Sequence, residues 1–144
     1  MSVSSWLTFN LRSKGASIDA VLGALSNCGW TTHREGHVVV LPLGDNDDFN
    51  WTSCAMSSAE LAELIQKKCE AGEVIGIVLM WKDSDVGGNF HIDSNSSLKV
   101  ALSINRVLLS ESLPYSNVSW YLERILPALQ SIGGTQTIEW SEYL

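Results

Sequence analysis

Acidic side chains gather in two short segments of this sequence and are its first candidates for a function. Carboxylates close to an aromatic ring are typical of protein interfaces, because tryptophan supplies binding energy and charge accelerates the encounter with a basic partner. The segment around position 47 combines both, and the segment around position 84 is a second acidic patch. We therefore predict a partner-binding surface formed by these residues: Asp45, Asp47, Asp48, Trp51, Asp83 and Asp85.

The second acidic segment begins like a calcium-binding EF-hand loop but does not continue like one. Asp83 and Asp85 occupy the first and third positions of such a loop, and Gly88 occupies the sixth. The twelfth position is Ser94, which cannot supply the bidentate carboxylate that calcium needs there. His33, Glu35 and His37 surround one tight turn, where mobile side chains make a poor metal site. We expect this chain to bind no metal.

The sequence carries no motif of the common enzyme classes. Glycine-rich phosphate loops, the GxSxG motif and the kinase signatures are all missing. Cys54 and His91 have the right types for a nucleophile and its base, but no local signature surrounds them, so a buried thiol is the simpler interpretation. We predict no catalytic residue and no cofactor. The alternative is a small enzyme with a site built from scattered residues, marked by a pocket with His91 or Cys54 beside a carboxylate and a shifted pKa.

Charge and cysteine content narrow the class of partner and the compartment. Sixteen acidic residues against nine basic ones give a net charge of −7, and Lys67-Lys68 is the only adjacent basic pair, so direct binding of nucleic acid is not expected. Three cysteines without a CxxC spacing are typical of reduced thiols. The longest apolar run, at 74–81, is too short to cross a membrane, and the N-terminus lacks a basic leader. We expect a cytoplasmic protein.

Hydrophobic periodicity predicts the elements that position these residues. Alternation with period two favours strands, whereas spacings of three and four favour helices. Ser57 with Glu60 forms a capping box at a helix start, the pair Glu35-Gly36 predicts a hairpin turn, and Pro127 predicts a kink or break. The expected strands lie at 6–11, 30–34, 37–43, 49–56, 74–81, 90–92, 98–104 and 135–140, and the helices run from Ser17 to Gly29, from Ser57 to Gly72, and from Ser116 or Ser119 to Gly133.

This order predicts one globular domain over the 144 residues, with an α+β fold. Hairpins between the helices favour a mainly antiparallel sheet with about three helices over a doubly wound parallel one. Six tryptophans are many for this length. We expect Trp81 and Trp120 in the core, and Trp51 and Trp140 partly exposed.

A small, acidic, cytoplasmic single domain without catalytic motifs resembles the bacterial toxin-immunity proteins, including those of contact-dependent growth inhibition systems. The resemblance is one of general character, because these families share no motif. It implies that the protein binds a cognate toxin, often a basic nuclease, with acidic side chains in the place of phosphates. The alternatives are the small enzyme and an adaptor subunit of a larger complex, which would show a contiguous exposed apolar patch. The oligomeric state has no signal in the sequence.

Overall fold

The computed structural model describes residues 4–12, 17–32, 34–46, 48–93 and 96–144. The elements in chain order are β1 (Ser4–Leu11), α1 (Ile18–Cys28), β2 (Trp30–Thr31), β3 (His37–Val40), β4 (Thr52–Ala55), α2 (Ser58–Glu70), β5 (Ile75–Trp81), β6 (Gly87–Asp93), β7 (Ser97–Ile104), β8 (Leu108–Ser110), β9 (Leu113–Ser116), α3 (Val118–Ser131) and β10 (Thr135–Tyr143).

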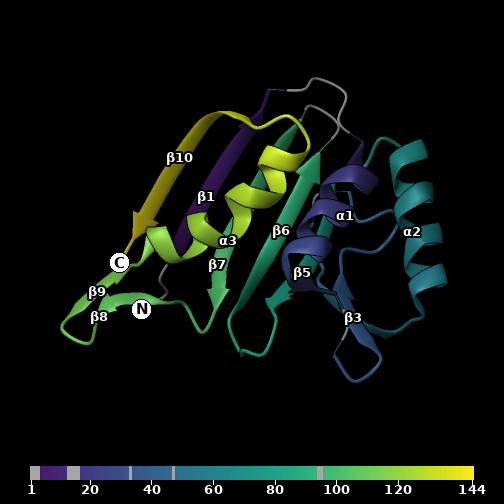
Figure 1. Cartoon of the computed structure of the whole chain (residues 1–144). Coiled ribbons are helices and arrows are strands. Elements are labelled where there is room, and N and C mark those ends of the chain that lie inside the picture. Colours follow the sequence, from purple (N-terminus) through teal and green to yellow (C-terminus); the bar gives the residue numbers. More distant parts are fainter. Residues whose placement is uncertain (1–3, 13–16, 33, 47, 94–95) are drawn as a thin grey trace.

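One sheet organises the molecule, in the order β10-β1-β7-β6-β5-β3-β4, with β2 also paired to β5. All of these pairings are antiparallel. The prediction of a single α+β domain with three helices and a mainly antiparallel sheet is confirmed in its fold class. In Figure 1, α1 and α3 lie across one face of the sheet, and the hairpin β8–β9 extends beyond it near the C-terminus.

The helices bury the apolar half of each alternating strand. In β1, Leu7 and Phe9 are fully buried, whereas Trp6 and Thr8 on the other face are partly exposed. The core also contains residues from the inner sides of all three helices: Leu25 of α1, Leu61 of α2 and Ile125 of α3. One face of the sheet is thus packed, and none of the helices among the described residues covers the other.

Local helix signals in the sequence are reproduced, apart from two features of the last helix. Ser17 caps α1, and Ser57 forms the full capping box with Glu60 at the start of α2. The last helix is capped by Asn117 rather than by a serine, and it continues through Pro127, so the prediction of an early break there is wrong. Tertiary packing explains this, because Ala128 and Leu129 beyond the proline are fully buried.

Several strand predictions differ from the structure: β3 ends at Val40 rather than at 43, and β6 begins at Gly87 rather than at 90. In the hairpin expected at 30–43, the described residues, which leave out His33, show one bridge, between Arg34 and His37, and β2 pairs with β5. The segment 49–51 lies outside β4. The last strand continues to Tyr143, since β1 pairs with it along its length.

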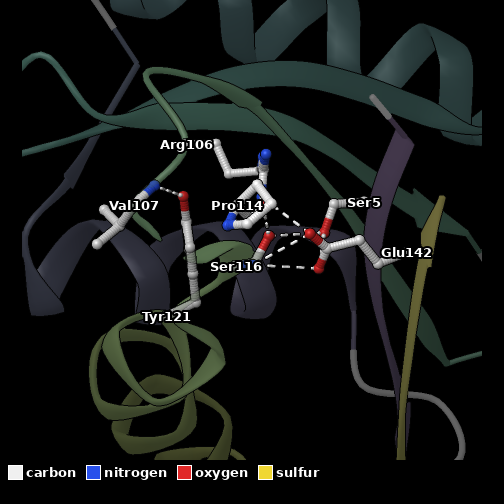
Figure 2. A network of polar contacts seen from close by, with 7 residues as sticks. All are labelled: Ser5, Arg106, Val107, Pro114, Ser116, Tyr121 and Glu142. Carbon is white, nitrogen blue, oxygen red and sulfur yellow. Dashed lines mark hydrogen bonds and ion pairs between the residues drawn. The ribbon is translucent and has the colours of Figure 1, made fainter. Parts of the chain in front are cut away.

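The hairpin β8–β9 was not predicted, and a buried ionic network holds it to the sheet (Figure 2). The Arg106 guanidinium lies 2.8 Å from the Glu142 carboxylate on β10 and donates to the Pro114 carbonyl. Glu142 also accepts the backbone N–H of Ser116, whose hydroxyl meets that of Ser5 on β1 at 3.0 Å. Both ends of the hairpin are therefore fixed to the edge of the sheet.

Among the residues that the structure describes, no helix has the length and apolar character needed to span a membrane.

Candidate binding groove

The uncovered face of the sheet carries a cluster of large side chains. Residues directly opposite each other in neighbouring strands share a face, so the register places Trp6 beside Ala101 and His91 beside Lys99. Trp6 lies on the face opposite the buried Leu7 and Phe9, and His91 lies opposite the buried Phe90 and Ile92. Three strands, β1, β7 and β6, thereby form the floor of a binding surface.

This floor is hollowed into a groove of about 660 Å³. Its walls come from the strands and from a loop between β3 and β4, and its lining residues are Trp6, Phe49, Trp51, Val74, Asn89, His91, Asp93, Ser97, Lys99 and Ala101. A volume of this size with a largely apolar lining and a few polar groups is typical of binding sites.

His91 lies at the centre of the groove, surrounded by three aromatic rings. The centroid of its imidazole is 5.5 Å from that of Trp6, 5.7 Å from that of Phe49 and 5.3 Å from that of Trp51. Lys99 lies beside this cluster, with its Nζ 4.5 Å from the centroid of the Trp6 ring. The site thus offers rings, one imidazole and one cation to a ligand.

The loop 41–51 brings two of these rings onto the sheet, and Gly76 makes room for it. A Cβ at Gly76 would lie 2.4 Å from Leu41 Cδ1 and 2.9 Å from Trp51 Cη2. These contacts are far shorter than van der Waals distances, so a residue with a Cβ there would have to displace the side chains of Leu41 and Trp51.

Asp45 holds the tip of this loop in shape. Its carboxylate accepts the backbone N–H of Phe49 at 2.8 Å and that of Asn50 at 2.9 Å. Phe49 has a φ of 54°, in the left-handed region that non-glycine residues rarely occupy. The loop therefore keeps Phe49 in a strained conformation and directs its ring toward His91.

A buried lysine anchors the base of the loop. Lys68 of α2 is 2% exposed, and its Nζ donates to the carbonyls of Leu41 at 2.8 Å and Pro42 at 3.1 Å. The Glu73 carboxylate lies 3.8 Å from this Nζ and accepts the backbone N–H of Gly44. One cation and one carboxylate thus tie the loop to the end of α2.

Burial shifts the pKa values of two side chains, His91 in the groove and Lys68 at the base of the loop. It lowers the pKa of His91, and the neighbouring Lys99 lowers it further, so the imidazole is neutral at neutral pH. Burial also lowers the pKa of Lys68, against the opposing effect of Glu73 and Asp45. The groove therefore presents a neutral imidazole among its rings.

The residues of the first predicted acidic patch differ in their exposure. Asp45 is only 6% exposed, and its carboxylate accepts backbone N–H groups of its own loop. Asp48 is exposed on the loop, Trp51 is half-buried in the groove, and Asp47 lies outside the described residues.

The second acidic patch lies elsewhere on the molecule. Asp83 and Asp85 are exposed in the turn between β5 and β6. The loop 41–51 meets β5 near its first residues, at Gly76, whereas this turn follows its last residue, on the order of 20 Å away along the strand. The two acidic segments do not form one continuous binding site.

Of the residues that make the groove, the sequence pointed to Trp51 and, as a possible base, to His91. It did not point to Trp6 or Lys99. The available signal for Trp6 was its place in an alternating strand, on the face opposite the apolar Leu7 and Phe9.

The nucleophile and base considered in the sequence are not brought together. Cys54 lies opposite Val38 on the helix-covered face, whereas His91 lies on the uncovered face. Asp93 shares the groove with His91, two residues further along β6. No group of three metal-binding side chains occurs within the described ranges, which leave out His33.

Comparison with known proteins gives no relative: no family model, no curated protein and no solved structure matches this chain.

Proposed function

We propose that this protein acts by binding another protein through the groove on its uncovered sheet face, and that the partner is a bacterial toxin which it neutralises in the cytoplasm. The proposal has two parts with different support. The geometry of the groove supports binding of a protein. The choice of a toxin rests on the resemblance in general character to immunity proteins.

The conformation of Phe49 carries the first part. Its side chain is 51% exposed, so it adds little to the core. A left-handed backbone costs a non-glycine residue about 1–2 kcal/mol, and Asp45 enforces that conformation. Strain of this kind gathers at functional sites, where the surrounding structure holds it in place. A loop built to present one exposed ring beside an aromatic groove is well suited to binding.

The chemistry of the groove favours a polypeptide partner that inserts an apolar or aromatic side chain. Aromatic rings in a partly desolvated pocket supply most of the binding energy at protein interfaces. The net charge of −7 favours a basic partner, because it accelerates association at low salt. Asp48, next to Phe49 in the chain, adds an exposed acidic residue to the same loop. Binding over a toxin's active site would block access of its substrate.

One observation favours the alternative of a small enzyme. His91 lies in a groove with Asp93 and has a lowered pKa, the combination expected of a general base. Its nearest neighbours are three rings, which take no part in proton transfer, and two residues along a strand separate its Cα from that of Asp93 by about 6.6 Å. Binding is therefore the better supported function.

The experiment combines the protein with the product of the gene next to its own. Co-expression should relieve growth arrest caused by that product, and the two purified proteins should form a stoichiometric complex that weakens with salt. Phe49→Ala should abolish protection and binding, whereas Leu43→Ala, an equally exposed apolar residue of the same loop outside the groove, should not.

Thermal melting of both variants checks that they remain folded. Full protection by Phe49→Ala would overturn the assignment of the groove as the binding site, and the absence of any complex would overturn the proposal. Protection at amounts of protein well below those of the toxin would favour the enzyme, because an inhibitor that works by binding must match its target in number.

A further inference from the structure

We propose that the outer edge of β10 pairs antiparallel with β10 of a second copy of this chain, so that two sheets join into one around a twofold axis. This inference is independent of the groove, because the axis is perpendicular to the sheet and leaves the uncovered faces of both copies free.

The two edges of the sheet differ in how much backbone they expose. One edge is β4, with four residues, whereas the other is β10, with nine. After an irregularity in the pairing near Asn10, residues 137–143 pair with β1 in continuous register. Every second N–H and C=O of β10 points away from β1, and among the described residues no other strand pairs with it.

The usual devices that protect an edge strand are missing from this regular part of β10. Proteins blunt exposed edges with proline, lysine, bulges or very short strands. Residues 137–143 contain neither proline nor lysine. Of its two glutamates, Glu142 is turned inward to Arg106, which leaves Glu139 as the exposed charge. Such an edge is a template for another extended chain.

The side chains of β10 also lack a cover on the helix side. Ile138 is 40% exposed and Trp140 is 47% exposed, although their neighbours on β1, Phe9 and Leu7, are fully buried. A groove of about 540 Å³ runs between α3 and β10, lined in part by Leu122, Leu126 and Pro127.

A second copy fits this region because the surface is self-complementary. In a twofold antiparallel pair both copies turn the same face to the same side, so Ile138 and Trp140 of each copy meet between the two α3 helices. A stable dimer needs on the order of 800 Å² from each copy. A strand edge about 23 Å long does not supply this area alone. The apolar groove beside α3 adds further surface to the interface.

Charge selects the register of this pairing. An axis at Glu139 would place two carboxylates directly opposite each other, which is unfavourable. An axis at Trp140 pairs the whole regular part of β10, residues 137–143, with the same residues of the other copy and places Glu139 opposite Ser141. We therefore expect the axis at Trp140.

Sedimentation of the purified protein, without any partner, tests this dimer over a range of concentrations. Because both copies carry a charge of −7, added salt should strengthen the dimer by screening their repulsion, opposite to its effect on a basic partner. Trp140→Lys places two ammonium groups at the axis and should raise the dissociation constant at least about tenfold. Ile138→Lys should also weaken the dimer.

Leu43→Lys is the matched control, since Leu43 is 48% exposed and lies between β3 and β4, at the opposite edge of the sheet. It should remain dimeric. A wild-type protein that stays monomeric at every concentration and at high salt would overturn the proposal, as would a dimer unaffected by Ile138→Lys and Trp140→Lys. Neither outcome bears on the groove, because this measurement uses no toxin.

Discussion

Two segments leave the sheet, the loop 41–51 and the hairpin β8–β9, and each is held by a buried cation. Lys68 holds the loop through two backbone carbonyls, with Glu73 3.8 Å away. Arg106 holds the hairpin through a direct pair with Glu142 at 2.8 Å. The loop carries Phe49 into the groove, whereas the hairpin exposes its apolar residues to solvent.

The difference lies in what each cation is tied to. Arg106 and Glu142 connect the hairpin to the edge strand β10 and, through Ser116 and Ser5, to β1. Lys68 connects the loop only to the end of α2 and the chain that follows it. We infer that the network of the hairpin supports the fold, whereas that of the loop positions the groove.

Glu142→Ala should give the largest loss of stability. The Glu142 side chain is 6% exposed, and its removal leaves the Arg106 charge and the Ser116 N–H without their partner. Breaking a buried ion pair by removing one member costs about 3–5 kcal/mol. Chemical denaturation measures the change in the free energy of unfolding.

Two further variants decide the interpretation of that result. Glu142→Gln keeps an acceptor for Ser116 but removes the charge, so it should lose less stability than the alanine variant. Glu139→Ala on the same strand removes an exposed carboxylate and should change stability little. If Glu142→Ala were as stable as Glu139→Ala, the hairpin would not be coupled to the fold in the way we infer.

Lys68→Met should cost less stability but should impair the groove. The carbonyls of Leu41 and Pro42 lose their donor, which costs about 2 kcal/mol for buried polar groups. The loop then loses its anchor, so amide hydrogen exchange at 44–51 should accelerate and partner affinity should fall. Lys67→Met is the control, because Lys67 is exposed on the same helix. Unchanged exchange in the loop of Lys68→Met would contradict the positioning role.

The contrast between the two segments also explains what the sequence could predict. Helix α2 was located from Ser57 and Glu60, because a capping box depends on residues three positions apart. The groove could not be predicted in this way, because a lysine is normally a surface residue and nothing in the local sequence shows that Lys68 is buried beneath the loop. The role of Gly76 could not be predicted for the same reason, because its close approach to Trp51 exists only where the loop meets β5 in the folded protein. The full length of β10 depends on β1, far away in the sequence.

The smallest expected effect is a pH dependence that belongs to the groove alone. The pKa of His91 is lowered from its usual 6.5 by burial and by Lys99, so the unfolded chain takes up a proton first as the pH falls below 6.5. Stability contributed by the neutral imidazole is therefore present above pH 6.5 and declines as the pH falls toward the lowered pKa. The hairpin residues 108–116 contain no histidine and should show no such dependence.

Thermal melting of the wild type and of His91→Phe between neutral and mildly acidic pH measures this contribution. The wild type should lose more stability than the variant on acidification, and Lys99→Met should reduce the loss, because removing the cation moves the pKa of His91 back toward its usual value. His37→Phe changes an exposed imidazole and should behave as the wild type. Equal acid sensitivity of wild type and His91→Phe would show that the groove does not hold a neutral imidazole, and would remove the electrostatic distinction between the two segments.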